Sequence, residues 1–271
     1  MARRDCAFAE CADDTHVDIC KSFIVAATAA MLVALSAGSA SAQAVWRGTT
    51  SNDWTDGTNW SSGTAPTAGS TVAINSATNN PILLGVGGAA AGTVGALVFG
   101  GTAGSTISLI IQNGSTLTST GALFRISANT GSTDIVTVTG AGSQLSGSAE
   151  LFMALGGVGT GILNIENGGL VTDTAGINLA NTGGTAAINI SSGGTLQTSF
   201  LVAGTGNAQI NFDNGTLRAT ASNANFFQNF AVPQLNIAAG GATIDTAGFS
   251  IGGPGFSGVG GLTKIGAGTL T

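Results

Sequence analysis

Cysteine, histidine, proline and charged side chains are scarce in this chain, and tyrosine is absent. The 271 residues include 3 Cys, 1 His and 4 Pro, and only 7% of them are charged. Every Cys and the single His lie within the first 20 residues. From residue 43 on, the sequence therefore excludes disulfides, a Cys nucleophile, a Ser-His-Asp triad and a histidine-ligated metal. A net charge of −6 with 7 Lys and Arg excludes a basic footprint for nucleic acid.

A short apolar run near the N-terminus has the form of an export signal. Residues 23–35 are apolar, follow Lys21, and precede small residues that end in Ala40-Ser41-Ala42. A membrane-spanning helix needs about 20 apolar residues, whereas a signal peptide needs fewer and a small-residue cleavage site. Residues 1–42 are predicted to be a leader and signal peptide, cleaved between Ala42 and Gln43, so that the mature part is exported through the inner membrane. Their first 20 residues are net acidic, which indicates a long leader or a start codon assigned too early.

The same leader contains four residues of types that bind zinc. Cys6, Cys11, His16 and Cys20 could in principle surround a zinc ion, since thiolates and imidazole are its usual ligands. Their spacing departs from that of a zinc knuckle, and they precede a segment that is expected to be removed. A discarded leader is the preferred interpretation, and no cofactor is expected.

An internal repeat dominates the remainder of the chain. An apolar-Asn-apolar strand, a short Asn/Ser/Gly turn and a second aliphatic strand recur around Asn164, Asn189, Asn211 and Asn236, and a divergent copy surrounds Thr137. Neighbouring copies lie 27, 25, 22 and 25 residues apart. This period predicts an all-β fold, a parallel β-helix (β-solenoid) of irregular coils of about 25 residues. A β-sandwich is the alternative, but it predicts no such register.

The repeated asparagines are expected to form an outward row. Side chains alternate along a strand, so Leu163 and Ile165 should enter the bore while Asn164 faces out. The row is either a polar strip that binds a ligand such as a glycan or a solvent-facing ladder whose amides hydrogen-bond to one another along the stack. The ladder is the preferred interpretation. Corners with positive φ are expected at three dipeptides, Asn113-Gly114, Asn167-Gly168 and Asn214-Gly215.

The C-terminal residues resemble a known family. The segment GGLTKIGAGTLT at 260–271 resembles the passenger-associated transport repeat of bacterial autotransporters; the motif positions are Gly261, Leu262, Thr263, Lys264, Gly266, Gly268, Thr269 and Leu270. Residues 136–180 are similar to passenger repeats of the same proteins. The resemblance implies a β-helical passenger over residues 86–271, carried across the outer membrane by a β-barrel translocator to the cell surface or medium. The chain is expected to be truncated within a transport repeat and to lack its translocator; a fragment, a two-partner passenger and a pseudogene product stay open.

All three tryptophans lie close together after the leader, at Trp46, Trp54 and Trp60. Residues 45–66 resemble the segment that follows the signal in many such passengers, and residues 43–85 are expected to form a Trp-rich N-terminal cap segment. We expect this Trp-rich segment to cap the first coil, because an open solenoid end invites edge-to-edge association. Stacking of the indoles on a glycan is the alternative.

Carboxylates are the remaining candidates for catalysis, since some parallel β-helices are polysaccharide lyases or hydrolases. Glu166 and Asp213 occupy the same repeat position two coils apart, roughly 10 Å, slightly beyond the separation in inverting glycosidases. Arg218 follows nearby and could flank them. Both carboxylates start turns, where such residues are ordinary. The preferred function is a structural, adhesin-like stalk without catalytic activity, whose partners are the translocator and a host or surface glycan or protein; the alternative is a polysaccharide-acting lyase or hydrolase.

Overall fold

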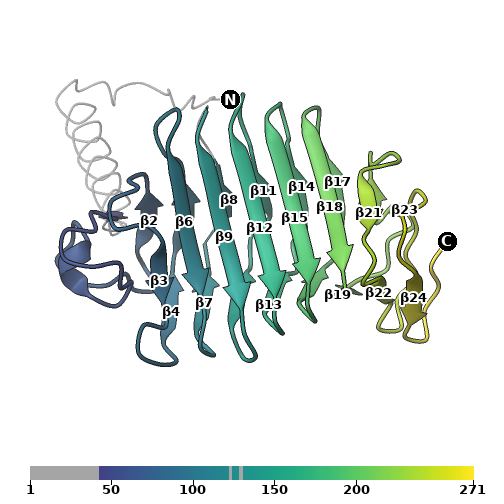
Figure 1. Ribbon diagram of the computed structural model, residues 1–271, viewed down its shortest axis with the longest axis horizontal. Helices are drawn as coiled ribbons and strands as arrows, with labels where there is room; N and C mark the ends of the chain where they lie inside the picture. Colours follow the sequence, from purple (N-terminus) through teal and green to yellow (C-terminus); the bar gives the residue numbers. More distant parts are fainter. Residues whose placement is uncertain (1–42, 122–123, 128–130) are drawn as a thin grey trace, which may run out of the picture. The chain divides into compact units, whose positions relative to one another are not determined.

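The computed structural model describes residues 43–271 except 122–123 and 128–130. These residues form a parallel β-solenoid of about eight turns with roughly 26 residues in each, and Figure 1 shows the coils following one another along a single axis. The predicted parallel β-helix is confirmed. The signal peptide, Ala42 and the cluster at Cys6, Cys11, His16 and Cys20 lie outside the described residues, and Gln43 is the first residue described.

Three eight-stranded parallel sheets form the walls, and each coil from β2 to β22 contributes one strand to each. Sheet I consists of β1 (Gln43–Val45), β2 (Thr71–Ile74), β5 (Ala96–Phe99), β8 (Phe124–Ile126), β11 (Leu151–Met153), β14 (Ile177–Leu179), β17 (Leu201–Ala203) and β20 (Phe227–Gln228). Sheet II consists of β3 (Ile82–Leu84), β6 (Thr106–Ile111), β9 (Thr133–Thr139), β12 (Thr160–Glu166), β15 (Thr185–Ser191), β18 (Asn207–Asp213), β21 (Leu235–Ile237) and β23 (Ser257–Gly258). Sheet III consists of β4 (Ala91–Val94), β7 (Thr116–Ser119), β10 (Gln144–Gly147), β13 (Leu170–Asp173), β16 (Thr195–Thr198), β19 (Gly215–Ala219), β22 (Ala242–Asp245) and β24 (Leu262–Ile265).

Rows of aliphatic side chains fill the bore. The seven-residue strands β9, β12 and β15 alternate strictly between half-buried and buried positions, as the two-residue period of a strand requires. One fully buried row in sheet II comprises Leu109, Val136, Leu163, Ile188, Ile210 and Leu235. Each such side chain contributes about 1.5–3 kcal/mol by leaving water, so the bore is the main source of stability.

The corners follow the Asn-Gly expectation in two of three cases. Asn113 and Asn167 have φ of 57° and 55°, and the glycine after each also has positive φ. Asn214 has φ of 63°, but Gly215 is not among the positive-φ glycines and instead begins β19. The prediction for Gly215 was wrong. A glycine is needed here because the backbone of the preceding coil lies too close for a side chain: an added Cβ would be 2.3 Å from the carbonyl oxygen of Ile190.

The Trp-rich segment contributes the first strands of the solenoid, and a loop joins two of them. β1 and β2 pair in parallel as the first two strands of sheet I, and β3 opens sheet II just before the expected boundary at residue 85. Between β1 and β2 lies a short 3-10 helix, η1 (Gly57–Asn59). The buried amide of Asn59 fixes this loop, since its Oδ1 accepts from the backbone N–H groups of Thr50 and Ser51.

Candidate functional site

The outward side of sheet II is the widest regular surface that the strands build. We call the outward residues of β9, β12, β15 and β18 the sheet II face. In register they form a hydroxyl row (Thr133, Thr160 and Thr185, continued by Asn207), an aliphatic row (Ile135, Ile162 and Ala187, continued by Gln209), an amide row (Asn164, Asn189 and Asn211, preceded by Thr137) and a rim row (Thr139, Glu166, Ser191 and Asp213). Most of these side chains are half-buried, so they are accessible but held by their neighbours.

Hydrogen bonds run along the amide row from coil to coil. Asn211 Nδ2 donates to Asn189 Oδ1 at 2.9 Å, and Asn189 Nδ2 donates to Asn164 Oδ1 at 2.8 Å. The chain ends where Asn164 Nδ2 donates to Thr137 Oγ1 at 3.2 Å. Asn236 pairs with Asn211 in the ladder register. The structure therefore brings the four repeat asparagines into one row and bonds three of them in the ladder arrangement.

The amide row keeps unused hydrogen-bonding capacity. A side-chain amide has two N–H donors and an oxygen with two lone pairs. Within the ladder, Asn189 uses one donor toward Asn164 and one acceptor position for Asn211. One donor and one acceptor position thus stay available in this amide, and the ladder fixes their orientation before any ligand arrives.

The three tryptophans form a packed, buried cluster. Trp60 meets Trp46 and Trp54 edge to face, with ring centroids 5.0 and 4.7 Å apart, and their exposed fractions are 1% for Trp46 and Trp54 and 2% for Trp60. Trp60 Nε1 donates to Trp54 O at 2.8 Å, and Trp46 Nε1 donates to Thr78 O at 3.0 Å. No indole face is free to stack on a sugar, so this geometry favours a cap and disfavours a glycan contact.

The candidate catalytic residues do not converge on one point. Asp213 pairs with Ser191, and Glu166 lies in the rim row one coil further away, at the end of β12. Asp213 Oδ1 accepts the backbone N–H of Gly240 at 2.8 Å. Arg218 lies on sheet III, where its Nε is 3.5 Å from the carboxylate of Asp245. Arg218 therefore serves a partner on the next coil, and the expectation that it flanks the Glu166–Asp213 pair was wrong.

Two carboxylates that the sequence analysis did not single out lie inside the solenoid. Asp134 on β9 and Asp173 on β13 are fully buried. Burial raises the pKa of Asp134, and it raises the pKa of Asp173 to about 7 against the opposing effect of the backbone N–H groups of Ala175 and Gly176. Asp173 Oδ1 accepts both of those N–H groups at 3.0 Å, whereas its Oδ2 has no hydrogen-bond partner among the described residues.

The burial of Asp134 and Asp173 could have been predicted from the alternation of buried and outward residues along their strands. Val136 and Val138 face the bore, so Asp134 two residues earlier must do the same; likewise Val171 places Asp173 inside. Their inward position was not predicted, because carboxylates are almost never fully buried without a partner.

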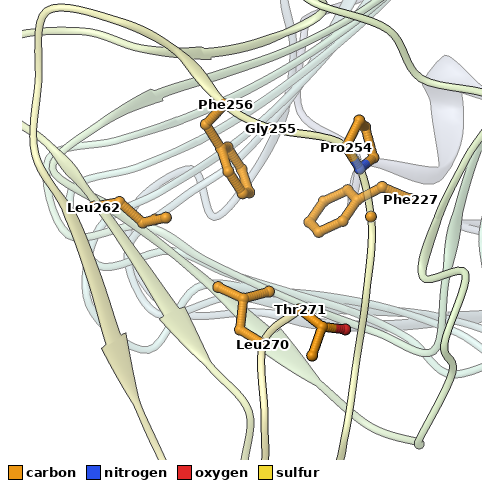
Figure 2. Close-up of a pocket in the computed structure, with 8 residues that line it drawn as sticks. Phe227, Pro254, Gly255, Phe256, Leu262, Leu270 and Thr271 are labelled. Atoms are coloured by element: carbon orange, nitrogen blue, oxygen red, sulfur yellow. The ribbon is translucent and has the colours of Figure 1, made fainter.

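The transport-repeat residues form the last coil, beside an apolar cavity. β24 pairs with β22 in parallel, Leu270 makes a bridge to Ile251, and Lys264 Nζ donates to Gly266 O at 2.6 Å. A cavity of about 350 Å³ opens at this end of the bore; its side-chain walls are Phe227, Pro254, Phe256, Leu262, Leu270 and Thr271. Figure 2 shows the two phenylalanine rings and the two leucines facing this space. Its lining offers no ionisable group for catalysis.

The described residues hold neither a metal-binding cluster nor a membrane-spanning helix. Residues 43–271, with their two short gaps, contain no group of three or more His, Cys, Asp or Glu side chains placed to hold a metal ion. Among the same residues, no helix has the length and apolar character to cross a membrane.

Comparison of the chain with protein-family models, curated protein sequences and solved structures finds no match.

Proposed function

We propose that the protein is an exported passenger of the autotransporter type, whose β-solenoid is a rigid stalk that presents an adhesive face and carries no catalytic activity. The observation that carries this proposal is the amide ladder, in which Asn211, Asn189 and Asn164 bond across successive coils. The hydrogen bonds of this ladder hold the outward asparagine side chains in fixed orientations, so that the same surface chemistry repeats from coil to coil. Weak contacts repeated along one rigid body give avidity without any deep pocket.

The sequence supports the route to the cell surface. The apolar run at 23–35 and the small residues before Gln43 have the form of a cleavable signal, and the residues of the last coil resemble a transport repeat. A chain without cysteine from residue 43 on is also suited to passage as an unfolded thread, since no disulfide loop can obstruct it. We infer that a β-barrel translocator completes the export, and that a host or surface glycan or protein is the second partner.

A polysaccharide-acting enzyme is the rival function. Its candidate carboxylates are Glu166 and Asp213, which lie two coils apart in the rim row with Ser191 between them. Arg218 lies on sheet III, where its guanidinium is directed to Asp245 on the neighbouring strand, so it does not assist this pair. The geometry therefore favours the stalk.

Export is tested by the position of signal cleavage. The full chain would be produced in a Gram-negative host, and the protein recovered outside the cytoplasm would be sequenced from its N-terminus. We expect the first residue to be Gln43. Ala42→Trp should block processing, because the residue before the cleaved bond must be small, whereas the matched variant Ser41→Trp should be processed. Recovery of the uncleaved chain in the cytoplasm alone would refute the passenger assignment.

A further inference from the structure

We propose that the sheet II face binds an extended, uncharged 1,4-linked β-glycan that lies along the stack of coils. This inference rests on the proposed function, because it names the ligand class of the adhesive face. It places the contact on sheet II, away from the buried tryptophans.

The chemistry of the rows matches that of a sugar chain. The aliphatic row, with Ile135 and Ile162 in adjacent coils, lies between the hydroxyl row and the amide row. The C–H faces of pyranose rings pack on apolar side chains, and their edges present hydroxyl groups. Thr133 and Thr160 on one side and Asn164 on the other offer donors and acceptors to those edges.

The spacing of the coils favours this ligand over a folded protein surface. Equivalent side chains of adjacent coils lie about 4.8 Å apart, the distance between neighbouring strands. One residue of an extended 1,4-linked β-glycan advances by a closely similar length. Consecutive sugars of such a chain are turned over relative to each other, so every second sugar presents the same edge to every second coil, whereas a helical α-glucan cannot keep this register. The ladder holds Asn164 and Asn189 in place beforehand, so binding costs little side-chain entropy.

The charge of the face selects a neutral polymer. The hydroxyl, aliphatic and amide rows contain no ionisable side chain. The rim row carries Glu166 and Asp213, which repel an anionic polysaccharide laid beside them. Cations that could attract such a polymer are absent from these four rows.

Sheet III is less regular than the sheet II face, because the charged side chains of Arg218 and Asp245 enter one of its outward rows. Its strands β10, β13, β16 and β19 have four or five residues, and residue type varies along both outward rows. Leu170 on β13 is aligned with Gln144 and Thr195, and Gln197 is aligned with Arg218. A repeating ligand would meet different chemistry at each step, so sheet III provides the matched control surface.

The test uses the purified full chain with cellohexaose as probe, measured by calorimetric titration. Maltohexaose controls for linkage, and carboxymethylated cellohexaose controls for charge. Ile162→Lys alters the aliphatic row, and Leu170→Lys alters an equally half-buried outward position on the next strand of the same coil. We expect Ile162→Lys to weaken cellohexaose binding at least ten-fold, Leu170→Lys to leave it within two-fold, and both control sugars to bind at least ten-fold more weakly.

A footprint on the wild-type protein keeps the test independent of folding defects. Saturating cellohexaose should slow hydrogen exchange in β9, β12, β15 and β18, and leave β10, β13 and β16 unchanged. No binding of cellohexaose, equal binding of maltohexaose, or protection on sheet III instead would overturn the inference. Cleavage at Gln43 is measured separately, so absent glycan binding with normal export overturns this inference alone, whereas binding without export overturns only the passenger assignment.

Discussion

Asn189 donates a hydrogen bond from its Nδ2 to the Oδ1 of Asn164, 2.8 Å away, although 25 residues separate the two in the chain. The repeat period of the sequence is thereby the period of a physical contact. Because Asn211 repeats the same bond one coil later and Asn164 bonds to Thr137 one coil earlier, the amide row links four coils through their outer surface while aliphatic rows link them through the bore.

Removal of one amide should weaken the stack. Asn189→Ala deletes the donor to Asn164 and the acceptor for Asn211, and we expect it to lower the free energy of unfolding by about 1–2 kcal/mol. The control is Gln197→Ala, an outward residue of β16 whose side chain makes no hydrogen bond to any described residue. Equal denaturation midpoints for the two variants would show that the ladder contributes nothing.

Adjacent glycines should respond differently to the same substitution. A Cβ on Gly194 would lie 2.1 Å from the carbonyl oxygen of Ile165 in the preceding coil, whereas a Cβ on Gly193 would have nothing nearer than 4.0 Å. Gly193 has φ of 80°, so Gly193→Ala should cost about 1–2 kcal/mol of backbone strain. Gly194→Ala must push two coils apart and should cost more in thermal or chemical unfolding. A smaller effect at Gly194 than at Gly193 would contradict this packing.

The fold was predictable from the sequence because the period and the alternation are both local signals. Asn164 and Leu163 face the sides that a two-residue alternation assigns to them. The predictions that were wrong concerned contacts with the neighbouring coil. Position 215 requires a glycine because the carbonyl oxygen of Ile190 lies close to it, and Arg218 pairs with Asp245, its register partner on the next coil. The burial of Asp173 followed from the alternation but contradicted the usual exposure of its residue type, and the packing of the tryptophans depends on a loop that has no repeat.

Stability should fall as the pH rises through the acidic range. Asp173 has a pKa of about 7 in the folded protein against 3.8 when unperturbed, because burial disfavours its charge. Between these values the folded chain keeps a proton that the unfolded chain has lost, so the free energy of unfolding declines from about pH 4 to pH 7 and then levels. The full decline from this group is roughly 4 kcal/mol.

Asparagine at this position isolates the effect. Asp173→Asn should flatten the pH profile of the denaturation midpoint and raise stability at pH 8 above that of the wild type. Burial also raises the pKa of Asp134, so Asp134→Asn is expected to remove a further, separate part of the slope. A profile of Asp173→Asn that runs parallel to the wild-type profile would rule out the buried carboxyl as the cause.

The tryptophan cap should depend on its middle ring. Trp60 contacts both other indoles and donates to Trp54 O, so Trp60→Ala should cost about 3–5 kcal/mol and expose the end of the bore. Trp60→Phe retains a ring and should cost less. Unfolding curves give the cost, and light scattering reports the edge-to-edge association that an open end permits. Wild-type stability in Trp60→Ala would exclude a capping role.

Bond cleavage separates a stalk from an enzyme most directly. The full chain, alongside Glu166→Gln and Asp213→Asn variants, would be incubated with cellohexaose and with neutral and acidic polysaccharides, and new reducing ends and unsaturated products would be measured over time. A stalk without catalytic activity leaves every substrate intact in all three proteins while the wild type still binds cellohexaose. Product release by the wild type that either substitution abolishes would contradict this function and establish the polysaccharide-acting alternative.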